Sequence, residues 1–190
     1  MTDVPDALER QRSYGFTAKF LHWLLFALLA AQFMVGATMP HIGRNTPFEG
    51  WVAWHVWLGA TVLFLIVVRL FWRLIRPVSL EPTSAKWERQ LALFTHWFLY
   101  LFVLVMTILG WAAANFRGWD VRVFGVVKLP ALAIKGDSWA HTAGDIHNFL
   151  VWPFLALIAL HIAAAFYHYF VRKDRILQRM LPLSVQSRAK

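Results

Sequence analysis

The stretch IHNFLVWPFLALIALHIAAAFYHYFV, residues 146–171, decides the fold. It contains no Asp, Glu, Lys or Arg, and it exceeds the length of about 20 helical residues that crosses the hydrocarbon core of a membrane. Three further apolar stretches of this kind occupy residues 17–39, 51–74 and 91–114. We therefore expect an all-α integral membrane protein, a single domain over residues 1–190, in which four transmembrane helices form a bundle.

The composition supports a lipid environment for most of the chain. Hydrophobic residues make up 59% of the 190 residues and charged residues 15%, a balance that a soluble domain of this length cannot hide from water. The net charge of +9 does not indicate nucleic acid, because the basic residues lie mostly beside the apolar stretches, where they set topology and meet lipid headgroups. The chain has no cysteine, which excludes iron–sulfur clusters, disulfides and covalently attached c-type haem.

The basic residues also predict how the helices are oriented. They concentrate before the first apolar stretch, between the second and third, and after the fourth, which predicts that both termini are cytoplasmic. The glycine-rich segment between the third and fourth stretches is expected to form a small structured cap on the outer face. The first stretch could alternatively be a signal peptide, but it is longer than the apolar region of such a peptide. The basic residues concerned are Arg10, Arg12, Lys19, Arg73, Arg76, Lys86, Arg89, Arg172, Lys173, Arg175, Arg179, Arg188 and Lys190.

Histidines are the residues most suggestive of chemistry. His147 and His161 are 14 residues apart, hence about 21 Å apart along one helix and about 40° from a common face, so one helix presents a ligand at each of two depths. His41 and His141 lie outside the spans and are expected to be surface residues. The other six of the eight lie in or at the ends of the spans, where an ionisable side chain is costly and marks a functional site: His22, His55, His96, His147, His161 and His168.

The directions of the helices then suggest two pairs of histidines. His55 enters the second helix from the outer side, level with His147, and His22 enters the first helix from the inner side, level with His161. Each pair can occupy both axial positions of one haem iron, and a site with no open position is suited to electron transfer rather than oxygen binding. We therefore predict two haem b groups between the helices, with these four histidines as iron ligands.

Spacing alone leaves other ligand sets open. His168 shares a face with His161 two turns nearer the cytoplasm, and His96 enters the third helix at a similar inner level. A histidine–methionine site is a further alternative, as is a bundle in which the histidines only form hydrogen bonds. The methionines concerned are Met34, Met39 and Met106.

The sequence resembles the bacterial di-haem cytochrome b561 family over nearly the whole chain. The likeness rests on KFLHW at residues 19–23, on His55 with Gly59, on VVRL at 67–70 and on LHIAAA at 160–165. It implies a multi-pass protein of the bacterial inner membrane that takes part in electron transport. It also implies axial ligands at His22, His55, His147 and His161, the same four residues that spacing favours.

Some members of this family are superoxide oxidases, which take electrons from superoxide at the outer face and give them to ubiquinone. The resemblance implies this oxidoreductase activity as a candidate, with ubiquinone as acceptor. A membrane-anchor cytochrome b subunit, which connects a peripheral dehydrogenase to quinone, is the alternative, and a haem-free scaffold is a third. Arg69 lies 14 residues from His55 and therefore about 21 Å deeper along the same helix. A cation at this depth can pair with a haem propionate or orient a quinone carbonyl. The alternative is an arginine whose side chain only snorkels to the membrane interface.

Overall fold

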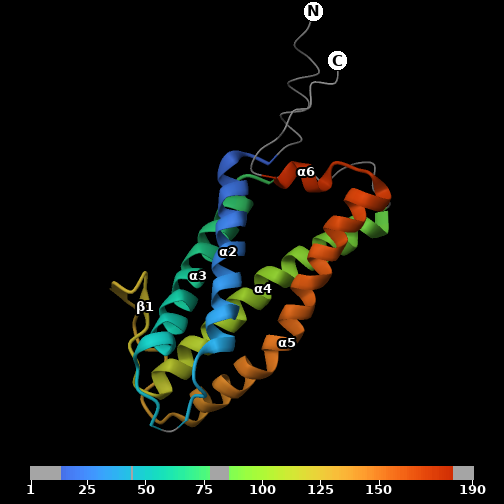
Figure 1. Ribbon diagram of the computed structural model, residues 1–190. Helices are drawn as coiled ribbons and strands as arrows, with labels where there is room; N and C mark the ends of the chain where they lie inside the picture. Colours follow the sequence, from blue (N-terminus) through green and yellow to red (C-terminus); the bar gives the residue numbers. More distant parts are fainter. Residues whose placement is uncertain (1–13, 44, 78–85, 182–190) are drawn as a thin grey trace, which may run out of the picture.

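The structure is a computed structural model that describes residues 14–43, 45–77 and 86–181. Within these ranges the chain forms four long helices that lie side by side (Figure 1). Arg10, Arg12, Arg188 and Lys190, four of the basic residues used to predict orientation, lie outside the described residues. The long helices are α2 (Phe16–Thr38), α3 (Gly50–Ile75), α4 (Lys86–Phe116) and α5 (Ser138–Tyr167), and the shorter elements are the π-helical turn η1 (His168–Arg172), the helix α6 (Ile176–Met180) and the strands β1 (Arg122–Val123) and β2 (Val127–Lys128).

Each long helix has the length and the apolar composition to cross a membrane. Large apolar side chains cover the outside of the bundle, with Trp152 76% exposed and Phe149 73% exposed. A contiguous apolar surface of this kind is unsuited to water and suited to lipid. The prediction of a membrane-spanning four-helix bundle is therefore confirmed.

Two of the helices are longer than the apolar stretches. The fourth, α5, begins at Ser138 rather than near residue 146, and α4 begins at Lys86 rather than near residue 91. Hydropathy reports only the part of a helix that meets hydrocarbon, whereas the backbone hydrogen bonding continues into the headgroup region, where polar side chains are solvated. His141 consequently lies on α5 and not in the loop before it.

The interior of the bundle is an apolar core halfway along its length. It contains buried side chains of all four long helices: Leu25, Val62, Ile66, Tyr100, Val103, Met106 and Phe154. Phe154 stacks on Phe102 with ring centres 5.7 Å apart, and it lies on α5 midway between His147 and His161. The apolar core thus separates the two depths at which the histidines occur.

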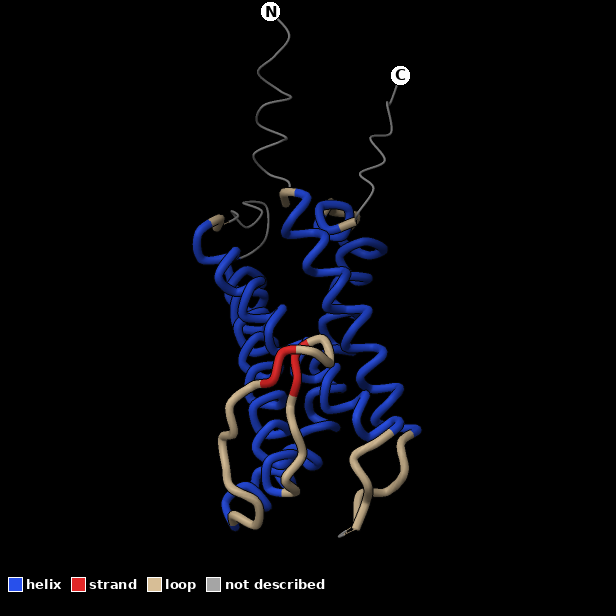
Figure 2. The backbone as a smooth tube through the Cα atoms, turned by 90° about the vertical axis from the view of Figure 1, so that its left-hand side faces the viewer, coloured by secondary structure: helices blue, strands red, loops and turns tan. Residues whose placement is uncertain are grey.

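The segment between α4 and α5 folds back along the bundle. Strands β1 and β2 pair antiparallel around a turn in which Phe124 and Gly125 have positive φ angles of 54° and 70°. The amide of Phe124 donates a hydrogen bond of 2.9 Å to the Thr61 hydroxyl, so the hairpin packs against the side of α3. Figure 2 shows the two strands lying over the side of the helical bundle. The segment expected to form a cap on the outer face therefore covers the flank of a helix. Helices α3 and α5 both begin at one end of the bundle, which we call the hairpin end.

The opposite end is closed by α6, which lies across it (Figure 1). Lys173 adopts a left-handed conformation with φ 52° and ends η1. Asp174 then accepts a hydrogen bond of 2.5 Å from His168 Nδ1 and one of 3.1 Å from the Ile176 amide. The Trp23 indole of α2 donates to the Met180 carbonyl at 2.7 Å. These contacts fasten α6 to both α2 and the end of α5, and we call this the α6 end.

Candidate functional site

His55 on α3 and His147 on α5 face each other near the hairpin end. Their ring centres are 6.3 Å apart and their ring planes make an angle of 89°. Both side chains are half-buried between the helices. The two residues that the sequence places at one depth on separate helices are therefore neighbours in the structure.

A hydrogen bond to the backbone fixes the His147 ring. Its Nδ1 lies 2.8 Å from the carbonyl oxygen of Met106 on α4. A carbonyl oxygen only accepts, so Nδ1 carries the proton and donates it. The other ring nitrogen, Nε2, then keeps its lone pair, which is the state required of a histidine that binds a metal.

Gln32 on α2 is a polar neighbour of His55 that sequence reasoning did not identify as part of the site. Its amide nitrogen lies 3.2 Å from His55 Nε2 and donates a hydrogen bond of 3.1 Å to the His55 carbonyl. The remaining polar atoms, Gln32 Oε1 and His55 Nδ1, are buried and have no hydrogen-bond partner in the described part of the chain. A buried unpaired polar atom is costly, so this pair of side chains is arranged for something other than internal hydrogen bonding alone.

Two glycines leave the space that the hairpin-end rings occupy. A methyl group on Gly36 of α2 would lie 3.1 Å from Cε1 of His55, and one on Gly110 of α4 would lie 3.1 Å from Cε1 of His147. Carbon atoms in favourable contact are about 3.5–4.0 Å apart, so any side chain at either position would displace a ring. Sequence reasoning also missed these residues, although glycine within an apolar helix at the depth of a histidine is a usable signal.

Three histidine rings meet near the α6 end. His22 on α2 and His161 on α5 have ring centres 6.4 Å apart with planes at 75°. His96 on α4 is closer to His161, with ring centres 5.4 Å apart, and its Nδ1 is buried without a partner among the described residues. The structure therefore brings together the predicted pair and one of the two alternative inner ligands.

Two arginines of α3 accompany these rings. Arg69 donates a hydrogen bond of 2.8 Å to the Ala18 carbonyl of α2, one helical turn before His22. Arg73 lies over the rings of Trp97 and Tyr100, 5.9 and 5.8 Å from their centres, and Trp97 directly follows His96 on α4. Arg69 thus lies near the α6-end histidines, and its role there stays a prediction.

Three other residues considered as ligands make different contacts or face outward. His168 is bonded to Asp174 on the η1 turn, and Met34 is 68% exposed. Met106 is buried in the apolar core and contributes its carbonyl, not its sulfur, to His147. His41 is exposed, as expected of a surface residue.

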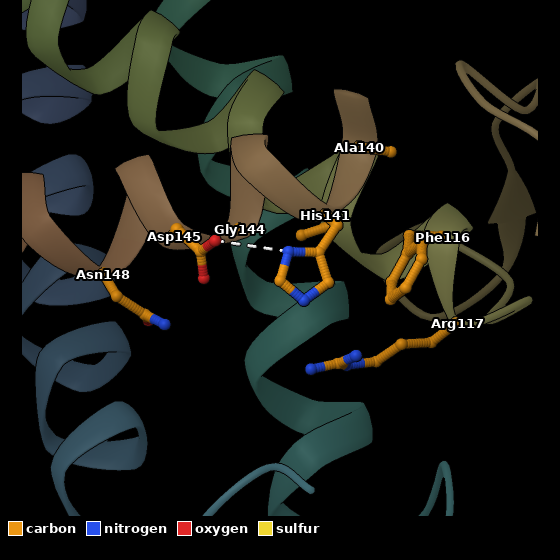
Figure 3. Close-up of a pocket in the computed structure, with 8 residues that line it drawn as sticks. Phe116, Arg117, Ala140, His141, Gly144, Asp145 and Asn148 are labelled. Atoms are coloured by element: carbon orange, nitrogen blue, oxygen red, sulfur yellow. Dashed lines mark ion pairs between the residues drawn. The ribbon is translucent and has the colours of Figure 1, made fainter. Parts of the chain in front are cut away.

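His141 is also exposed and lines a small pocket between α4 and α5 at the hairpin end (Figure 3). It forms an ion pair of 3.2 Å with Asp145, and its ring meets Phe116 edge-on. Arg117 extends along the same pocket.

The two histidine pairs fit haem better than a bare metal ion. Among the described residues, no group of three or more His, Cys, Asp or Glu is arranged to hold an ion directly. A metal that brings its own equatorial ligands needs only two axial imidazoles, and nitrogens about 2 Å from it on either side set the ring centres roughly 6 Å apart. The separations of 6.3 and 6.4 Å meet this requirement, whereas the 5.4 Å between His96 and His161 is shorter.

Comparisons with known proteins lead in the same direction. The sequence is 29% identical to cytochrome b561 homolog 2 of Escherichia coli over 173 residues, which cover 88% of this chain and 90% of that protein. It is 27% identical to the probable superoxide oxidase CybB of Yersinia pestis over 164 residues, 85% of this chain and 92% of the relative. Cytochrome b562 of Cereibacter sphaeroides is 28% identical over 166 residues, 85% of this chain and 90% of the relative. Residues 13–183 match the family model for prokaryotic cytochrome b561, and the chain therefore belongs to that family.

Proposed function

We propose that this chain holds two haem b groups, one between His55 and His147 and one between His22 and His161, and passes electrons from one depth of the membrane to the other. Membership of the prokaryotic cytochrome b561 family accounts for membrane electron transfer and for b-type haem. The observation that supports two sites is that the ring pairs have nearly equal separations, 6.3 and 6.4 Å, on either side of the apolar core. When bound, haem supplies reversible one-electron chemistry.

The protein's own residues prepare each site for that group. At the hairpin end, Met106 selects the His147 tautomer whose Nε2 is free to coordinate, and the two glycines give the rings room to face each other. The Gln32 amide nitrogen lies 3.2 Å from His55 Nε2, the nitrogen that would bind the metal, and it holds the His55 carbonyl with a hydrogen bond of 3.1 Å. At the α6 end, Arg69 is the proposed partner of an anionic or polar group, either a haem propionate or a quinone carbonyl.

We further propose that the α6 end faces the cytoplasm and the hairpin end faces outward. An excess of described basic residues at the α6 end supports this. That end has Arg76, Lys86, Arg89, Arg172, Lys173, Arg175 and Arg179, whereas the hairpin end has Arg117, Arg122, Lys128 and Lys135. Both chain termini would then be cytoplasmic, in a multi-pass protein of the bacterial inner membrane.

The proposed reaction is the oxidation of superoxide at the hairpin end coupled to reduction of ubiquinone. Similarity to a probable superoxide oxidase over 85% of this chain supports it. Two superoxide anions each lose one electron and become O₂, and ubiquinone takes up both electrons with two protons to become ubiquinol. The histidine pairs lie at two depths, so they can relay electrons between a donor outside and an acceptor within the membrane.

The test begins with the purified full-length protein and a pyridine haemochrome assay, for which we expect two haem b per chain. Superoxide is then generated enzymatically, and haem reduction is followed with and without superoxide dismutase. We expect dismutase to suppress the reduction and added ubiquinone to reoxidise the protein. Reduction that dismutase leaves unchanged would exclude superoxide as donor. A soluble dehydrogenase that co-purifies in equal amount would instead favour a membrane-anchor subunit.

A further inference from the structure

The two histidine pairs have different electrostatic surroundings. At the α6 end, Arg69 is hydrogen-bonded to the Ala18 carbonyl, one helical turn before His22, and Arg73 lies over the ring of Trp97, the residue that follows His96. At the hairpin end, the residues that the structure shows against the His55 and His147 rings, Gln32, Gly36, Met106 and Gly110, are uncharged. Positive charge is therefore concentrated beside one pair only.

Both arginines are held in place by the fold. The hydrogen bond of 2.8 Å from Arg69 Nη1 to the Ala18 carbonyl ties α3 to α2, and Arg73 is positioned over two aromatic rings of α4. Both side chains are half-buried, so water screens them less than it screens an exposed cation such as Arg76. Their charges are thus fixed features of the α6-end site.

Hydrogen bonding to the histidines also favours a lower reduction potential at the hairpin end than at the α6 end. The Met106 carbonyl accepts a proton from His147 Nδ1 at 2.8 Å, which makes that imidazole a stronger electron donor. In the described part of the chain, neither His22 nor His161 has an acceptor on its Nδ1. A stronger donor favours an oxidised metal, whereas neighbouring positive charge favours a reduced one, because reduction adds one negative charge.

We infer that Arg69 and Arg73 hold the reduction potential of the α6-end site above that of the hairpin-end site, so that an electron shared by the two is favoured at the α6 end. This inference rests on the proposed function, since it requires a haem at each pair. It assigns the two arginines a positioning and tuning role in setting the direction of electron transfer, beyond any contact with a haem propionate.

The test is a redox titration of the full-length protein, read from the haem absorption bands. The His147→Ala variant keeps a complete ligand pair only at the α6 end. The His161→Ala variant keeps one only at the hairpin end. The reduction potential of each site can thus be measured alone. We expect the His147→Ala protein to have the higher potential. The reverse order would overturn the inference.

Substitutions of the arginines test the cause. Arg69→Gln and Arg73→Gln, each made in the His147→Ala background, should lower the equilibrium constant for reduction about tenfold for Arg69 and less for Arg73. A tenfold change is about 59 mV for a one-electron couple. Arg69→Lys keeps the charge and should restore most of the potential. Arg76→Gln, which removes an exposed cation from the same end of α3, is the matched control and should change it little.

The outcomes separate the inference from the function on which it rests. Two haems per chain with a potential that neither Arg69→Gln nor Arg73→Gln changes would overturn the inference and leave the proposed function standing. Fewer than two haems in the unsubstituted protein would overturn the two-haem function, and the inference with it. If Arg69→Gln fails to retain haem, the Arg73→Gln protein decides between these results, because Arg73 lies over the rings of Trp97 and Tyr100, which are not proposed ligands.

Discussion

Gly110→Ala tests whether the hairpin-end site depends on the space that a glycine leaves. The added methyl group would lie 3.1 Å from Cε1 and 3.2 Å from Nδ1 of His147. Favourable contacts between carbon atoms begin near 3.5 Å, so the ring must move by roughly 0.4 Å or the helices must separate. A ring that moves also weakens its hydrogen bond to the Met106 carbonyl.

The magnitude follows from the cost of overpacking. Inserting a methyl group into a filled site costs about 1–3 kcal/mol of folding free energy. Alanine has a better helix propensity than glycine, which offsets about 1 kcal/mol of this cost. The overall stability of the bundle should therefore change little. The strain falls on a ligand, so haem affinity at the hairpin end should drop by roughly 5- to 100-fold while the α6-end site is unaffected.

The assay measures haem per chain and the rate at which haem is lost to an excess of apomyoglobin. Gly144→Ala is the matched control, because its methyl group would lie 3.2 Å from Cβ of Ala113 at the same α4–α5 contact without touching a histidine. We expect two phases of haem loss in the Gly110→Ala protein, with only one accelerated. Equal acceleration in the Gly144→Ala protein, or no acceleration in either, would refute the reasoning.

Three further predictions concern other parts of the molecule. His147→Ala should remove one haem and His161→Ala the other, as read from haem content and low-temperature spectra; if His96→Ala abolishes the α6-end haem while His161→Ala spares it, the assignment of that site is wrong. The Lys128 ammonium, together with Arg122, holds the pKa of Asp120 below its usual range, so the ion pairs of the hairpin are complete above about pH 4 and are lost only as the pH falls through that lowered value; limited proteolysis between pH 3 and 8 should show a protected hairpin at every pH above about 4. Trp23→Phe removes the 2.7 Å hydrogen bond to the Met180 carbonyl and should make α6 more sensitive to trypsin without changing haem content; loss of haem would show that α6 supports the site.

The sequence predicts the features that repeat along a single helix. Four apolar stretches predict the four spans because lipid requires about 20 apolar residues per crossing. The 14-residue spacing of His147 and His161 predicts two depths because helical rise and rotation are fixed by the backbone. Both depths also appear in the structure, where each ring of α5 faces a histidine of another helix.

Features that depend on contacts between helices could not be predicted in the same way. Gly36 and Gly110 matter because of the rings opposite them, and periodicity along one helix says nothing about which residue faces it. His96 remained one of two alternatives because its distance to His161 depends on the packing of α4 against α5. The role of Gln32 depends on the position of His55 on another helix, which the sequence does not show.

The apolar core between the two histidine pairs has an electrical consequence. Its buried members are hydrocarbon side chains apart from Tyr100 and Met106, so it offers no continuous path by which a proton accompanies an electron. In the proposed arrangement an electron would therefore cross about 21 Å of a hydrocarbon layer roughly 30 Å thick as a bare charge. Moving it inward works against a membrane potential that is negative inside, by about 1.6 kcal/mol per 100 mV. The rate at which this protein turns over would then fall as the cell energises its membrane, and the cations beside the α6-end pair would offset part of that opposition.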